Sequence, residues 1–201
     1  MQTALDQFRL NINRVRNIAG LYISIRGMTT SALDLSDLLR IQLVMCVSAL
    51  DHYIHEVTRI GILQIFNGQR VSTPAFLRYE ICLDSVLQAL SPGSSTAWLD
   101  AEIRTRHGYL SFQQPDKIAD AIRLISPVDL WNSLGFSLGD TPQNLKTRLR
   151  LIIDRRNKIT HEADVDPTYP GSGVRWPINE TLVNDSVDFV ERLCEALYAL
   201  L

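Results

Sequence analysis

The chain has 201 residues, of which 46% are hydrophobic, and a chain of this length can bury one core as a single domain. Its formal net charge of −2 and its pI near 6.1 do not indicate a general nucleic-acid binder, which would carry a large basic excess. The longest apolar stretch, residues 43–50, is too short to span a bilayer, and the N-terminus lacks the pattern of a signal peptide. We therefore expect a cytoplasmic protein with no membrane partner, in which three cysteines without CxxC spacing are reduced core residues: Cys46, Cys82 and Cys194.

Hydrophobic spacing predicts helices and no strand of convincing length, so the expected fold class is all-α. The first predicted helix covers residues 3–25, and turn residues break it at 27–31. A long second helix is expected from residue 34 or 36 to residue 66. Its middle is apolar on nearly all sides, which is typical of a helix at the centre of a core or between a core and a dimer partner. The expected architecture is a multi-helix bundle of one domain, 1–201, with residues 32–201 as its core and the first helix packed on it.

Further helices are predicted at residues 74–90, 96–106, 115–125, 127–134, from 142 onward, and 179–201. The first of these has five expected core residues: Phe76, Leu77, Ile81, Val86 and Leu90. Turn residues predict loops at 91–95, 135–140 and 167–177. The last loop is expected to be either a cover or substrate contact through Tyr169, Arg175 and Trp176, or an ordinary connection.

The helix predicted from Pro142 onward is the most informative part of the chain. Thr141 suits the N-cap, and Pro142 fits the first helical position, where no amide donor is needed. Apolar residues then recur at steps of four and three, and the same steps place Arg156 where an apolar residue is expected. A guanidinium in such a place is costly to desolvate unless an anion meets it.

Asn157 and His161 are one helical turn apart and share a face that borders the one carrying Arg156. These three residues suit phosphodiester chemistry, because arginine can hold phosphate oxygens in a bidentate way and histidine can move protons near neutral pH. The simpler alternative is an arginine ion-paired to a neighbouring helix and a histidine that caps the helix or lies on the surface. Six basic residues between Lys146 and Lys158 allow a short phosphate track, or an ordinary solvated helix face.

The segment Arg155-Arg156-Asn157-Lys158-Ile159-Thr160-His161-Glu162 resembles the signature of the HEPN superfamily. That signature is an arginine, usually followed by a polar residue, and a histidine after four to six intervening positions. Arg156 and His161 enclose four residues, whereas counting from Arg155 gives five; Asn157 favours Arg156 as the motif arginine. With Glu-Ala-Asp after the histidine, the chain most resembles the RiboL-PSP-HEPN subfamily, from about the second helix to the C-terminus.

The resemblance implies a HEPN-like helical bundle that dimerises and a metal-independent endoribonuclease without a cofactor. The expected catalytic residues are Arg156, His161 and Asn157, and the expected RNA-binding residues are Arg155 and Lys158. RNA, a second copy of the chain and an antitoxin or regulatory protein are the implied partners, in toxin–antitoxin or anti-phage defence. The alternative is a non-catalytic HEPN module for helical interaction or nucleotide binding.

A second polar group, Asp51, His52, His55 and Glu56, follows the apolar middle of the second helix. Asp51 and His55 are one turn apart, as are His52 and Glu56, so a metal hydrolase is a further alternative. The order is not HExxH and no third ligand cluster is evident, so we expect no metal and regard helix-surface pairing as the simpler interpretation. A third hypothesis places Asp51 and His55 in the cleft of Arg156, because the subfamily looks similar through residues 49–53.

Overall fold

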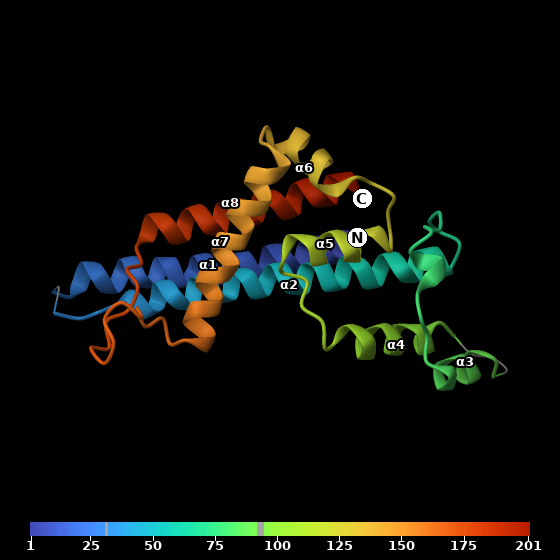
Figure 1. The fold of residues 1–201 in the computed structure, drawn as a ribbon, viewed down its shortest axis with the longest axis horizontal. Helices are drawn as coiled ribbons and strands as arrows, with labels where there is room; N and C mark the ends of the chain where they lie inside the picture. Colours follow the sequence, from blue (N-terminus) through green and yellow to red (C-terminus); the bar gives the residue numbers. More distant parts are fainter. Residues whose placement is uncertain (31, 92–94) are drawn as a thin grey trace.

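The structure is a computed structural model that describes residues 1–30, 32–91 and 95–201. This part of the chain is all-α, as expected, and Figure 1 shows long helices crossing one another as a bundle. The helices are α1 (Gln2–Met28), α2 (Ser36–Phe66), α3 (Leu83–Ala89), α4 (Ala97–His107), α5 (Pro115–Arg123), α6 (Leu130–Leu138), α7 (Pro142–His161) and α8 (Glu180–Leu200), with a 3-10 turn, η1 (Phe76–Arg78). Within the described ranges, no helix combines the length and apolar character needed to cross a membrane.

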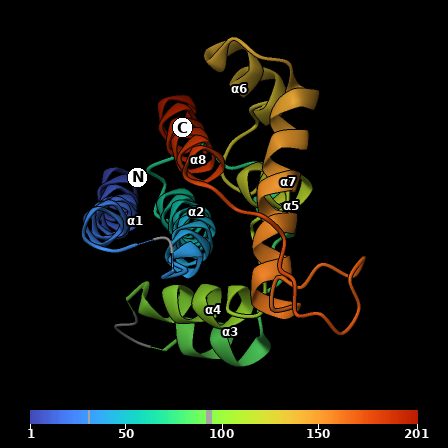
Figure 2. The ribbon, with the colours of Figure 1, turned by 90° about the vertical axis from the view of Figure 1, so that its left-hand side faces the viewer.

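α2 is the central helix of the bundle. It contacts α1, α4, α5, α7 and α8, and Figure 2 shows several of these helices arranged around it. Leu43, Cys46, Tyr53 and Ile54 of α2 are fully buried. Each large apolar side chain buried in this way contributes about 1.5–3 kcal/mol to stability. The prediction that this helix lies at the centre of the core is therefore confirmed.

α1 runs along α2 and α8 and begins and ends a few residues beyond its predicted limits. Phe8, Ile12 and Val15 form its buried face, and the Phe8 ring lies 5.2 Å from the ring of Tyr53 on α2. Its outer face pairs with α8, where Arg9 places Nε 2.7 Å from Glu195. Such exposed pairs contribute little energy, so the buried face is what holds α1 in place.

The helix predicted over residues 74–90 is wrong, and the structure has η1, an extended stretch and α3 instead. Glu102 of α4 explains the interruption, because its carboxylate accepts the backbone N–H of Cys82 at 2.9 Å and the hydroxyl of Ser85 at 2.7 Å. That N–H is therefore not used in the i to i−4 ladder of a continuous helix. Two expected core residues are exposed as a result, Leu77 and Leu90, and Cys82 is exposed whereas Cys46 and Cys194 are buried.

α6 begins and ends later than predicted, and two glycines explain its limits. Gly135 was expected in a loop but lies inside the helix, where an added Cβ would come within 2.8 Å of the carbonyl oxygen of Asp140. Gly139 ends the helix with φ of 67°, a left-handed conformation that favours glycine. The loop expected at 91–95 falls largely on residues 92–94, which lie outside the described residues, as does residue 31 of the expected break at 27–31.

Candidate functional site

α7 carries the predicted catalytic residues near its C-terminal end and packs across α2. Thr141 caps the N-terminus of α7 by accepting the backbone N–H of Asn144 at 3.1 Å, as its sequence predicted. Leu149 and Ile152 are buried in the core. Arg156 continues their spacing and is half-buried, so the end of the apolar stripe carries a guanidinium.

Arg156 has an unsatisfied donor. Its Nε atom is buried and has no hydrogen-bond partner among the residues that the structure describes. Burial lowers the pKa of this guanidinium, while the negative charge of Asp51 on α2 acts in the opposite direction. A buried donor without a partner lowers the stability of the fold by about 1–3 kcal/mol, and by more when it is charged. An anionic ligand that accepted this hydrogen bond would remove that desolvation penalty.

Arg155, the neighbouring residue, is already occupied. Its two Nη atoms donate to the carboxylate of Asp164 at 2.5 and 2.9 Å, and Nη2 also donates to the carbonyl of Trp176 at 3.0 Å. Asp164 is 1% exposed and accepts a further hydrogen bond from Nε of Arg40 at 2.6 Å. This buried cluster fastens the end of α7 to α2 and to the loop after it. The structure thus uses Arg155 to hold the motif helix, and its expected contact with RNA stays a prediction.

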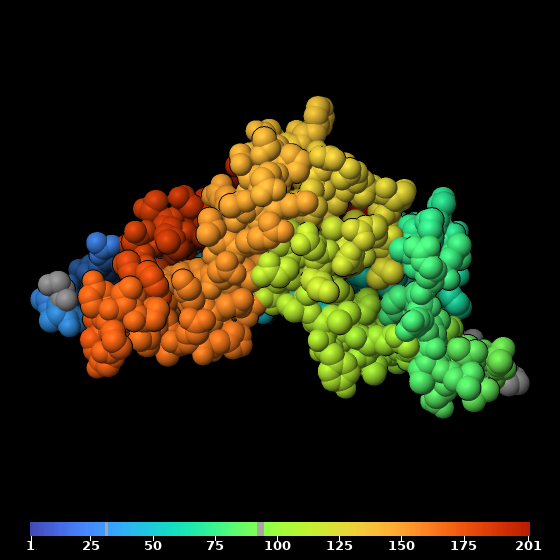
Figure 3. Space-filling model, viewed as in Figure 1, coloured from blue at the N-terminus to red at the C-terminus, as the bar shows by residue number. Residues whose placement is uncertain are grey.

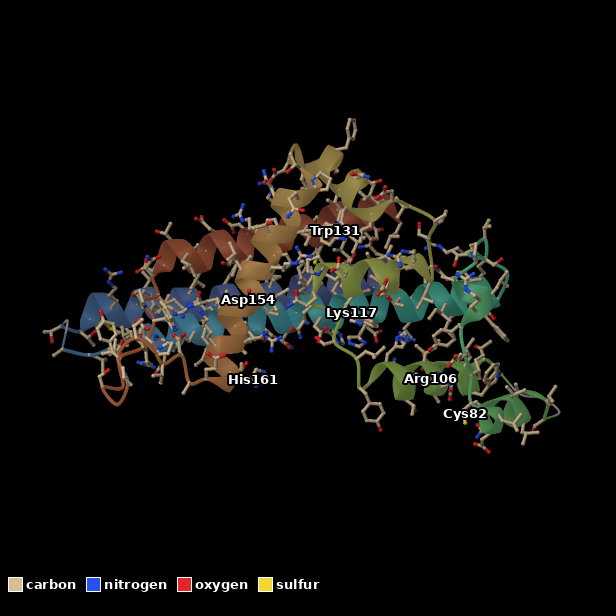
Figure 4. The ribbon with its side chains drawn as sticks, viewed as in Figure 1. Cys82, Arg106, Lys117, Trp131, Asp154 and His161 are labelled. Carbon is tan, nitrogen blue, oxygen red and sulfur yellow. The ribbon has the colours of Figure 1, made fainter. Side chains whose placement is uncertain are left out.

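His161 is the last residue of α7 and is exposed, at the end of the helix seen in Figure 4. Asn157 lies one turn before it, and Arg150 lies on the same face two turns before Asn157. Nη2 of Arg150 reaches the carboxylate of Asp116 on α5 at 3.4 Å, so this face of α7 is turned toward α5. Figure 3 shows a notch between the C-terminal part of α7 and the chain around α4 and α5. His161, labelled in Figure 4, lies at the α7 side of this notch.

Lys158 lies on the side of α7 that faces α8 and the loop after α7. Its Nζ is 4.5 Å from the centre of the Trp176 ring, and it lines a cavity of about 760 Å³ between α7 and α8. Asn157 also contributes to the lining of that cavity, together with Arg148. Lys158 precedes His161 by three residues on α7, and the expected contact of Lys158 with RNA stays a prediction. Trp176 and Arg175 belong to the loop that was considered as a cover, and both are held by neighbouring residues.

Asp51 and His55 lie on α2 opposite the segment that connects α4 to α5, residues 108–114. The Asp51 carboxylate accepts the backbone N–H of Phe112 at 2.6 Å and the side-chain amide of Gln113 at 3.1 Å. His55 has its Nε2 atom 3.8 Å from Asp51, and its ring centre is 4.4 Å from that of Phe112. Asp51 and His55 thus form one polar cluster between α2 and the connecting segment, and the charge of Asp51 opposes the effect of burial on the pKa of Arg156.

His52 and Glu56 lie elsewhere on α2 and line a cavity of about 820 Å³ formed with α1 and α4. Glu56 is held by Arg59, whose Nη2 atom is 2.7 Å away. The four residues of the metal-hydrolase alternative thus divide between two sides of the helix. Across the described ranges, no group of three or more histidine, cysteine or acidic side chains is arranged to hold a metal ion. The side-chain arrangement therefore gives that alternative no support.

His107 was missed in the sequence, because no spacing pattern links it to the motif. It ends α4, is 5% exposed, and has a buried Nδ1 atom without a partner among the described residues. Its Nε2 lies 3.3 Å from the hydroxyl of Tyr79, and its ring centre is 5.4 Å from that of Phe112. Burial lowers the pKa of His107 to about 4, so the imidazole is neutral at physiological pH.

Comparison with protein-family models gives a match to RiboL-PSP-HEPN over residues 9–201. The match extends from within α1 to the end of the chain and so includes the whole of α7 with Arg156 and His161. No curated protein and no solved structure matches the chain.

Proposed function

The chain belongs to the RiboL-PSP-HEPN family, and from this premise we propose that it is a metal-independent endoribonuclease whose active site combines two copies of α7. The observation that carries the proposal is the contrast between two adjacent arginines. Arg155 is occupied by buried Asp164, whereas Arg156 keeps a buried donor without a partner in the described part of the chain. Arg156 is thus available for a phosphate, and His161 lies exposed at the end of the same helix.

The proposed reaction is attack of an RNA 2′-hydroxyl on the adjacent phosphorus. His161 of one protomer accepts the proton of the 2′-hydroxyl, and the partner's His161 donates a proton to the departing 5′ oxygen. Arg156 stabilises the negative charge that develops on the phosphate oxygens, and Asn157 orients the imidazole or the phosphate. The products are a 2′,3′-cyclic phosphate and a 5′-hydroxyl. DNA is not a substrate, because it lacks the nucleophile.

The geometry of α7 supports a site shared between two chains. Residues five apart on a regular helix lie about 140° apart around its axis. Arg156 accordingly turns toward α2 and is half-buried, whereas His161 is exposed. One chain therefore offers a phosphate-binding guanidinium and a proton carrier that do not converge, and a second chain would supply the missing group. Sedimentation of the purified protein should accordingly give the mass of a dimer.

The biological setting that we propose follows from the family resemblance. We propose that the enzyme acts on cellular RNA in the cytoplasm as a toxin or in anti-phage defence. An antitoxin or regulatory protein would then restrain it until cleavage is needed. Purification of the tagged chain from its native cells should bring down a second, untagged protein. This would test the regulator separately from the chemistry.

The test of the proposed activity is a gel assay of purified protein on total RNA with EDTA present throughout. Wild type should cleave, and His161→Ala and Arg156→Ala should lose cleavage while still sedimenting as wild type does. Matched controls are His52→Ala and Arg14→Ala, which remove the same side chains at exposed positions on α2 and α1. Equal activity in His161→Ala and His52→Ala would refute the assignment. RNA binding without cleavage by wild type would favour the non-catalytic module.

A further inference from the structure

A third cavity, of about 720 Å³, lies between α4, the connecting segment 108–114 and α5. Much of its wall is aromatic or apolar and includes Tyr79, His107, Tyr109, Leu110 and Phe112. Tyr109 is 90% exposed, so its ring is free to close over a bound group. An aromatic ring that is this exposed buries little apolar area, so it contributes little to the stability of the fold.

The polar groups inside this cavity are uncharged at physiological pH. Burial lowers the pKa of His107 to about 4 and raises the pKa of Tyr79 to about 12. His107 and Tyr79 are paired through Nε2 and the hydroxyl, and Nδ1 of His107 remains without a partner among the described residues. A cavity with flat walls and neutral hydrogen-bonding groups suits a flat, neutral, heteroaromatic group.

The lining of the cavity includes one free positive charge. Lys117 of α5 is exposed, and the described residues give it no ion-pair partner, whereas Arg106 of α4 is paired with Glu102 at 2.8 Å. In Figure 4, Arg106 and His161 lie along the lower side of the view, and Lys117 lies above and between them. The one acidic residue at the rim, Asp120, is paired with Arg123 at 2.7 Å. The opening therefore favours an anionic group beside the flat one.

The cavity shares a wall with the candidate site. Phe112 contacts the ring of His107 and the ring of His55, and its backbone N–H donates to Asp51. The aromatic cavity is thus continuous, through Phe112, with Asp51 and His55, and the charge of Asp51 also acts on Arg156.

From this continuity we infer that the cavity binds an unpaired nucleobase of a single-stranded RNA whose backbone runs past Arg156. The base stacks on Tyr109, hydrogen-bonds to the His107–Tyr79 pair, and leaves its phosphate near Lys117. The inference rests on the proposed function and specifies its substrate as single-stranded RNA. The bound base belongs to a nucleotide that does not flank the cleaved bond. An aromatic ring stacks on every kind of base. Binding should therefore require an unpaired base at this position but no particular sequence.

The test uses catalytically inert His161→Ala protein and a fluorescent random-sequence 12-nucleotide single-stranded RNA. Adding Tyr109→Ala should weaken binding roughly tenfold, within the range for loss of one stacked base, whereas Phe136→Ala should leave binding unchanged. Phe136 is a matched control because it is also a highly exposed aromatic residue, on α6. A duplex of the same length should compete poorly, since its bases are paired.

The outcomes separate this inference from the proposed activity. If wild type cleaves RNA but Tyr109→Ala changes neither affinity nor cleavage pattern, the base site is refuted and the ribonuclease stands. If wild type does not cleave but Tyr109→Ala still weakens RNA binding, the base site stands without the activity. Failure of the inert protein to bind single-stranded RNA, or an equal loss of binding in Phe136→Ala, would refute the base site and would make a protein partner the next occupant to test for this cavity.

Discussion

Arg155 directs both of its Nη atoms to the carboxylate of Asp164, at 2.5 and 2.9 Å, and shares that carboxylate with Arg40. Ala163 and Asp164 have positive φ values of 50° and 59°, a conformation that non-glycine residues adopt at some cost. The chain therefore turns sharply just after His161, and the two arginines hold the turned residue in place. Arg156, in contrast, has a buried Nε atom without a partner among the described residues, and we propose it as the motif arginine that meets a ligand.

Asp164→Asn should lower the free energy of unfolding by about 3–5 kcal/mol, because it leaves two largely buried guanidinium groups without their counter-charge. Urea denaturation followed by circular dichroism measures this. Asp154→Asn on the exposed face of α7 is the control and should change stability by less than about 0.5 kcal/mol. Similar midpoints for the two variants would mean that the cluster does not hold the end of α7.

Arg155→Leu and Arg156→Leu should have opposite effects. Arg155→Leu breaks a buried pair and should cost stability on the order of 3 kcal/mol. Arg156→Leu removes a buried unpartnered donor from an apolar stripe, so its stability should equal or exceed that of wild type, while cleavage of RNA is lost. Thermal unfolding and the cleavage assay on the same preparations decide the matter. Equal destabilisation by both substitutions would contradict the division of roles.

Gly61→Ala should destabilise the protein by about 1–3 kcal/mol, because an added Cβ on α2 would lie 2.6 Å from Cγ2 of Ile125. The control is Gly20→Ala in α1, where nothing lies within 4 Å of the added atom. That change should be neutral or stabilise by up to about 1 kcal/mol through helix propensity. Melting temperatures of the two variants test how tightly α2 packs on the chain after α5, and a neutral Gly61→Ala would show looser packing.

Stability should fall as the pH drops from 6.5 toward 4. The pKa of His107 is lowered to about 4 in the folded protein, so in this window the unfolded chain binds a proton that the folded protein does not. The loss is on the order of 3 kcal/mol at the acidic end, and the contribution of His107 is constant above about pH 7. His107→Gln should reduce the slope of urea midpoint against pH in this window. Identical slopes for wild type and the variant would place the acid sensitivity elsewhere.

Local signals in the sequence correctly predicted the start of α7 at Thr141 and Pro142. They also predicted that the middle of α2 is central and that Arg156 interrupts an apolar stripe. The helix over residues 74–90 was wrong because Glu102, distant in sequence, takes the N–H of Cys82. The link from Arg155 to Asp164 and the pairing of His107 with Tyr79 likewise depend on tertiary contacts, which no periodicity within one helix reveals.

The central claim is tested most directly by the ends of the RNA fragments that the wild-type protein makes in EDTA. We predict 2′,3′-cyclic phosphate and 5′-hydroxyl ends. A single 2′-deoxy substitution in the ribose on the 5′ side of a mapped cleavage site should prevent cleavage there. His161→Ala should not cleave at all. Fragments with 5′-phosphate ends, cleavage at the deoxy-substituted bond, or full activity in His161→Ala would contradict a HEPN-type ribonuclease mechanism.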